Sequence, residues 1–135
     1  MNKKLAYLMQ LLTDKGYATE YDRANKQLLC YGEDTYGMLF HVFKIESEAL
    51  EITSIHSTYL VDDFLTEARE IIRETNRDIP LGQFHLNETG HITFYARYKW
   101  DKENNLSVEE VCEDVFRAGS LCRQALFENM LCQKE

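Results

Sequence analysis

Apolar residues recur with helical spacing in three parts of the chain. Near the N-terminus they fall at i, i+3, i+4 and i+7, which predicts a helix over residues 2–15 that ends at Gly16. A second helix is predicted from Asp62, a suitable N-cap, to Thr75, and a third begins at the capping box of residues 107–110. The three apolar stripes are Leu5, Leu8, Met9 and Leu12; then Phe64, Leu65, Ala68, Ile71 and Ile72; then Val108, Val111, Cys112, Val115, Phe116, Cys122, Leu126 and Met130.

Alternation of apolar and polar residues predicts four strands between the first two helices. They cover residues 17–22, 27–31, 36–45 and 49–56, with turns at 23–26 and at Gly32-Glu33-Asp34. The third strand is apolar on both faces, because Leu39, His41, Phe43 and Ile45 share one face while Met38, Phe40, Val42 and Lys44 share the other. An antiparallel sheet with one solvated face alternates cleanly, so we expect that something covers this second face or is able to cover it.

Residues 76–99 predict a helix end at Asn76, an extended turn at Pro80 and a β-hairpin. With Glu88-Thr89-Gly90 as a three-residue loop and Gly90 at positive φ, Leu86 pairs with Ile92, Phe84 with Phe94, and Gly82 lies opposite Ala96. Every apolar side chain of the hairpin then lies on one face. A two- or four-residue loop would scatter them over both faces, so the pattern predicts this register.

The predicted element order is α-β-β-β-β-α-β-β-α, which indicates an α+β fold with an antiparallel sheet and helices packed on one face. The 135 residues are 44% hydrophobic and 12% aromatic, enough for a packed core. No linker, repeat or low-complexity segment divides the chain, so residues 1–135 are expected to form a single domain.

The formal net charge of -8 repels phosphate groups, which disfavours nucleic acids and anionic membranes as partners. No apolar run approaches the roughly 20 residues of a membrane span. Lys3-Lys4 followed by residues 5–12 has some likeness to a secretion signal, but Gln10 interrupts the apolar run and a polar segment follows it. We therefore interpret this segment as an amphipathic helix and expect a cytoplasmic protein.

Several motifs together carry a resemblance to a known family. They are Asn76, the strand Leu81-Gly82-Gln83-Phe84-His85-Leu86-Asn87, the strand start Gly90-His91-Ile92-Thr93-Phe94, and Leu106-Ser107 before the last helix. With these motifs the chain resembles the YbjN-type proteins, bacterial proteins labelled as sensory transduction regulators, whose fold is similar to that of type III secretion chaperones. The resemblance implies binding and regulation without known catalytic residues. It also implies a homodimer that holds an extended segment of a protein partner.

The sequence offers little chemistry beyond this. Cys30 stands apart, and Cys112, Cys122 and Cys132 are spaced so that they fan out around a helix; all four are expected to be buried thiols. In the predicted register His85 and His91 are diagonal neighbours on the outer face of the hairpin, and two ligands make a weak metal site. His41 and His56 are expected to be half-buried residues with satisfied hydrogen bonds. No phosphate-binding loop or activated nucleophile is present, so we expect neither an enzyme nor a cofactor.

The leading interpretation is a non-catalytic, chaperone-like or regulatory adaptor that binds a protein partner. The candidate partner or dimer surface is Met38, Phe40, Val42 and Tyr95, because aromatic residues and methionine are favoured at interfaces. Packing of these side chains under loops is the simpler explanation. A small-ligand or metal-binding sensor domain built around His85 and His91 is the alternative function.

Overall fold

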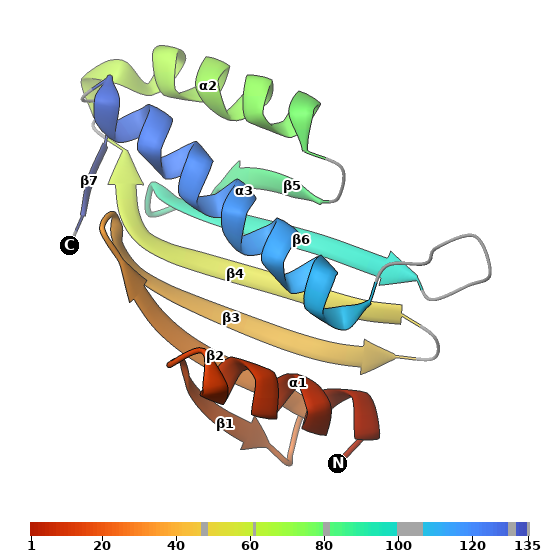
Figure 1. Cartoon of the computed structure of the whole chain (residues 1–135). Coiled ribbons are helices and arrows are strands. Elements are labelled where there is room, and N and C mark those ends of the chain that lie inside the picture. The colour runs from red at the N-terminus through yellow and green to blue at the C-terminus, as the bar shows by residue number, and fades with distance from the viewer. Residues whose placement is uncertain (47–48, 61, 80–81, 100–106, 130–131, 135) are drawn as a thin grey trace.

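A computed structural model describes residues 1–46, 49–60, 62–79, 82–99, 107–129 and 132–134 (Figure 1). These described residues form three α-helices and a seven-stranded sheet. The helices are α1 (Lys3–Asp14), α2 (Leu65–Asp78) and α3 (Val108–Glu128), and η1 (Asp62–Phe64) is a short 3-10 turn before α2. The strands are β1 (Ala18–Asp22), β2 (Gln27–Asp34), β3 (Gly37–Glu46), β4 (Ala49–Leu60), β5 (Gln83–Leu86), β6 (His91–Lys99) and β7 (Cys132–Lys134).

The sheet is antiparallel in the order β1-β2-β3-β4-β6-β5, and β7 pairs with the end of β4. Figure 1 shows the helices on one side of the sheet, with α1 near β1 and β2 and with α2 and α3 beside each other. This confirms the predicted α+β architecture and element order, to which β7 is an addition. The predicted turn at Pro80 and Met130 of the third stripe lie outside the described residues.

The core lies between the helices and the inner face of the sheet. Leu5, Leu8 and Leu12 of α1 are buried, as are Val111, Cys112, Val115, Cys122 and Leu126 of α3. They pack against inward side chains of the strands, including Leu28, Phe43, Ile52, Phe84 and Phe94. The predicted stripes of α1 and α3 are confirmed at these positions, and Ser107 caps α3 by accepting a hydrogen bond from the Glu110 N–H at 3.1 Å.

The hairpin register is confirmed. Leu86 pairs with Ile92 and Phe84 with Phe94. The Asn87 N–H donates to the His91 carbonyl at 3.0 Å, which closes a loop of residues 88–90, and Gly90 has φ +82. Phe84, Ile92, Phe94 and Ala96 therefore point into the core together, whereas Tyr95 points outward.

The predicted turn at Gly32-Glu33-Asp34 is wrong, because β2 continues through it to Asp34. Asp34 pairs with Gly37, and the Asp34 carboxylate accepts a hydrogen bond from the Tyr36 N–H at 2.9 Å, so the turn consists of residues 35–36. The glycine has another role within the strand. A β-carbon at Gly32 would lie 2.3 Å from Cε1 of Tyr17, so the absence of a side chain makes room for that ring.

The start and the end of the second helix also differ from the prediction. Asp62 begins η1 rather than capping α2, and Phe64 precedes the helix with no side-chain cap and is exposed, outside the apolar stripe. Asn76 does not end the helix, which continues to Asp78. The sequence pattern could not show that the Asn76 side chain is bound by another strand, as described below.

Candidate functional site

The outer face of the sheet, opposite the helices, carries a cluster of apolar side chains. We call this cluster the outer patch. Met38, Phe40 and Val42 of β3 point outward, as the alternation predicted. Phe40 pairs with Tyr31 and Ile55, and Val42 pairs with Leu29 on one side and with Thr53 on the other. The Tyr31 and Phe40 rings lie 4.9 Å apart between centroids. The outer patch consists of Leu29, Tyr31, Met38, Phe40, Val42, Ile55 and Tyr95.

The exposed fractions show that no described residue covers this face. Met38 is 56% exposed and Tyr95 45% exposed, while Phe40 and Val42 are half-buried by their neighbours in the sheet. Met38, Phe40 and Val42 are contiguous, whereas Tyr95 is separated from Val42 by Thr53 in the same cross-strand row. These side chains are therefore not packed under loops of the described part of the chain.

The sequence analysis missed three members of the outer patch, Leu29, Tyr31 and Ile55. Leu29 lies beside Tyr31 on the outward side of β2, between Gln27 and Glu33, and Ile55 is an isolated apolar residue among the polar outward residues of β4. Cross-strand pairing brings Tyr31 and Ile55 beside Phe40, one on each side, and Leu29 beside Val42. Their signal is visible only once the strand register is known.

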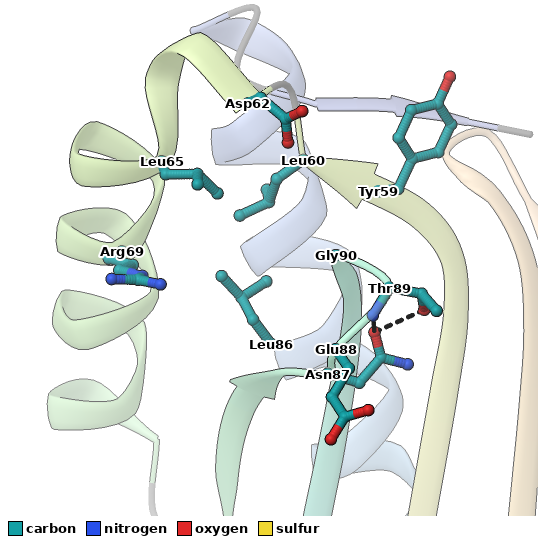
Figure 2. A pocket seen from close by; sticks show the side chains of 10 residues that line it. All are labelled: Tyr59, Leu60, Asp62, Leu65, Arg69, Leu86, Asn87, Glu88, Thr89 and Gly90. Carbon is teal, nitrogen blue, oxygen red and sulfur yellow. Dashed lines mark hydrogen bonds between the residues drawn. The ribbon is translucent and has the colours of Figure 1, made fainter.

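An open cleft of about 640 Å³ lies where the end of β4, the start of α2 and the β5–β6 loop meet (Figure 2). Its floor is apolar, with Leu60, Leu65 and Leu86 pointing toward one another. Arg69 of α2 points into it from one wall, and Thr89 on the other wall donates two hydrogen bonds to the Asn87 side-chain oxygen. The described lining contains no histidine, cysteine or lysine.

Asn76 closes the free edge of the sheet beside this cleft. Its side-chain oxygen accepts the Phe84 N–H at 2.6 Å, and its side-chain nitrogen donates to the Phe84 carbonyl at 3.0 Å. The amide group thus takes the place of a neighbouring strand at Phe84, whose backbone N–H and carbonyl point away from β6. An edge strand protected in this way is a poor template for pairing with another chain. The outer face of the sheet is therefore a better candidate binding surface than the β5 edge.

Polar residues are buried on the inner side of the sheet beneath α3. Arg123 is 0% exposed and holds both oxygens of Asp34, and its Nε donates to the Gly119 carbonyl at 3.2 Å. The sequence analysis missed it, although Arg123 follows Gly119 by four residues and Cys122 by one, within the apolar stripe of α3. A bidentate carboxylate partner makes such burial of a guanidinium possible.

The prediction for His41 and His56 is wrong in both respects. Both are 2% exposed rather than half-buried, and among the described residues Nε2 of His41 and Nδ1 of His56 have no hydrogen-bond partner. His41 Nδ1 lies 2.5 Å from Oγ of Ser54. Burial, reinforced by the nearby Arg123 charge, lowers the pKa of His41 to about 4 and that of His56 to about 2. A β-carbon at Gly119 would lie 3.3 Å from His56, so the glycine permits close contact of α3 with the sheet.

The remaining candidate groups do not form a chemical centre. His85 pairs with Thr93 and is exposed, as predicted, and the described residues contain no group of three or more metal-ligating side chains. Burial raises the pKa of the Cys30 and Cys112 thiols to about 12 and that of Cys122 to about 11, so these thiols stay protonated and unreactive. None of the described helices is long and apolar enough to cross a membrane.

Comparison with known proteins gives a fold but no residue-level function. No family model matches the chain, and no curated protein matches its sequence. Among solved structures, the chain is similar to YbjN from E. coli, described as "a putative transcription regulator", with a TM-score of 0.57 over 95% of this chain and 94% of that one. The sequence identity is 9%, so the likeness shows that the two share a fold. It supports the predicted YbjN-like architecture.

Proposed function

We propose that this chain is a non-catalytic binding module with an adaptor or regulatory role, and that it holds a protein partner through the outer patch. The observation that carries the proposal is the uncovered apolar face of the sheet. Four of its seven members, Tyr31, Met38, Ile55 and Tyr95, are exposed on the side of the sheet opposite the helices. The likeness to a protein described as "a putative transcription regulator" supports the regulatory part.

The composition of the outer patch fits a protein interface. Aromatic residues and methionine are enriched at interface cores, and Tyr31, Phe40 and Tyr95 supply rings while Met38 supplies a flexible thioether. Contiguous apolar area on a soluble domain marks a surface that another molecule covers. The protonated buried thiols and the neutral buried histidines leave no activated nucleophile among the described side chains, which supports a non-catalytic role.

A matched pair of variants tests the proposal. Met38 is 56% exposed on the outer patch, and Leu121 is 57% exposed on α3, on the opposite side of the molecule. Replacement of either by Asp removes an exposed apolar side chain and adds one negative charge, with little effect on folding because both sites are solvated. Each tagged variant is used to capture partners from the native cytoplasm, with the eluted proteins identified by mass spectrometry.

We expect Met38→Asp to lower the recovery of specific partners at least tenfold and Leu121→Asp to leave it unchanged. Thermal melting of both variants establishes that they are folded. Equal recovery by the two variants contradicts the assignment of the outer patch as the binding surface.

A further inference from the structure

A second recess adjoins the cleft of Figure 2, and the two together form a groove along α2 beside β5. The recess has a volume of about 350 Å³ and lies farther along the helix, where Ile72, Arg73 and Asn76 line it. Arg69 and Leu86 line both the cleft and the recess, which places them at the junction. We call the cleft and the recess together the α2 groove. No residue of the outer patch lines it, so the α2 groove is a separate surface.

The two ends of the α2 groove differ in charge. Asp62 and Glu88 line only the cleft end. Arg73 and His85 line only the recess end. Arg69, at the junction, points into the groove in Figure 2 and makes no ion pair or side-chain hydrogen bond within the described part of the chain. Its guanidinium is therefore an uncompensated positive charge beside apolar side chains.

We propose that the α2 groove binds a small carboxylate that carries an unbranched apolar chain, as octanoate does. The carboxylate group lies against Arg69, and the chain lies over the leucines of the cleft floor. This inference goes beyond the proposed function, because it assigns a small-molecule ligand to a surface that the protein partner does not use.

The charges select both the head group and its direction. A guanidinium presents parallel N–H groups that match the two oxygens of a carboxylate. Arg73 follows Arg69 by one helical turn and adds positive charge at the recess end, and its exposed ion pair with Glu70, at 2.8 Å, contributes little to stability. Asp62 and Glu88 repel an anion from the cleft end, so the head group points toward the recess. These acidic residues and the net charge of -8 also disfavour a doubly charged phosphate.

The floor of the cleft suits an apolar chain. Leu60 is 5% exposed, and the half-buried Leu65 and Leu86 point toward it in Figure 2. The helix rises about 12 Å from Leu65 to Arg73, which gives room for a chain of medium length beside the charged end. Each methylene group buried on this floor should raise the affinity about two- to fourfold.

Isothermal titration calorimetry of the purified full chain with octanoate tests the inference. We expect saturable one-to-one binding with a Kd below about 1 mM, and a Kd about tenfold higher for hexanoate, which lacks two methylene groups. Octanol and octylammonium have the same chain without the carboxylate, and we expect both to bind at least tenfold more weakly than octanoate. An absence of saturable octanoate binding overturns the inference, and so does octanol binding as tight as that of octanoate.

A matched pair of variants tests the role of Arg69. Arg69→Gln removes the charge at the junction, and Arg77→Gln removes an exposed positive charge from the same helix at a position that lines neither the cleft nor the recess. We expect Arg69→Gln to raise the Kd for octanoate at least fivefold and Arg77→Gln to leave it unchanged, with thermal melting to establish that both are folded. Equal Kd values for the two variants contradict the assignment of Arg69.

The Met38→Asp variant separates this inference from the proposed function. Met38 lies on the outer patch and not in the α2 groove, so Met38→Asp should bind octanoate as the wild type does while it loses the protein partner. If Met38→Asp abolishes octanoate binding, the ligand lies on the outer patch and the inference is wrong. If no octanoate binds and partner capture still depends on Met38, the groove site is refuted while the proposed function stands.

Discussion

Gly82 and Gly90 provide a controlled test of how tightly the hairpin is packed. Both have positive φ, +81 and +82, so a side chain at either position meets nearly the same backbone strain. The space around them differs. A β-carbon at Gly82 would lie 2.4 Å from Cζ of Phe94 and 2.7 Å from the Tyr95 carbonyl oxygen, whereas nothing lies within 4 Å of one at Gly90.

The two replacements by Ala therefore separate backbone strain from crowding. The left-handed conformation costs a residue with a β-carbon about 1 kcal/mol, which is the whole effect expected for Gly90→Ala. Gly82→Ala adds an overpacked contact with a buried ring and with backbone, a further cost of about 2–3 kcal/mol. We expect free energies of unfolding lower by about 1 kcal/mol for Gly90→Ala and by about 3–4 kcal/mol for Gly82→Ala.

Urea denaturation followed by far-UV circular dichroism measures both values under the same conditions. The m-values of both variants should equal that of the wild type, because neither change alters the surface exposed on unfolding. A difference between the variants below about 1 kcal/mol would refute the reasoning. It would mean that Phe94 moves away from Gly82 at little cost and that this part of the inner face is not closely packed.

Three further predictions concern the buried polar groups. Lowering the pH from 8 to 5 should reduce the free energy of unfolding by about 2 kcal/mol for each of His41 and His56. The reason is that the imidazoles of the unfolded chain bind protons below about pH 6.5, whereas the pKa values in the folded protein are about 4 and about 2. Equal free energies of unfolding at the two pH values, measured by urea titration, contradict this. Asp34→Asn should cost about 3 kcal/mol by leaving the Arg123 charge buried and uncompensated, and a loss under about 1 kcal/mol contradicts it. Asn76→Ala should cost about 2 kcal/mol and speed amide exchange on the edge of β5, and unchanged exchange contradicts it.

The sequence predicted those parts of the fold whose pattern is local. The hairpin register followed from one requirement, that Phe84, Leu86, Ile92 and Phe94 share a face, and this holds whatever the rest of the chain does. The outward direction of Met38, Phe40 and Val42 followed in the same way from alternation along one strand. Both depend only on the alternation of side chains between the two faces of a strand, which a few neighbouring residues establish.

The errors arose where a residue's role depends on a distant partner. Gly32 is a residue type typical of turns, but here its lack of a side chain makes room for the ring of Tyr17, which directly precedes the neighbouring strand β1. Asn76 has the signal of a helix end, but its amide pairs with β5. Arg123 lies within the apolar stripe of α3, but its charge indicates a solvated residue, and the pair with Asp34, 89 residues away in sequence, allows its burial. Local propensity cannot contain such information.

Two unusual features of this fold lie next to each other at the turn between β2 and β3. One is the buried charge of Arg123, and the other is the apolar outer patch. Asp34 ends β2 and Gly37 begins β3, so the pair with Arg123 fixes this turn against α3 from the inner side. Met38 follows directly and projects from the outer side, and its N–H donates to Oγ of Ser57 on β4 at 2.9 Å. A buried ion pair contributes little net stability but restricts geometry, and a binding surface loses less entropy on association when its side chains start from a fixed backbone. The inner charge is therefore best understood as positioning the most exposed residue of the outer patch.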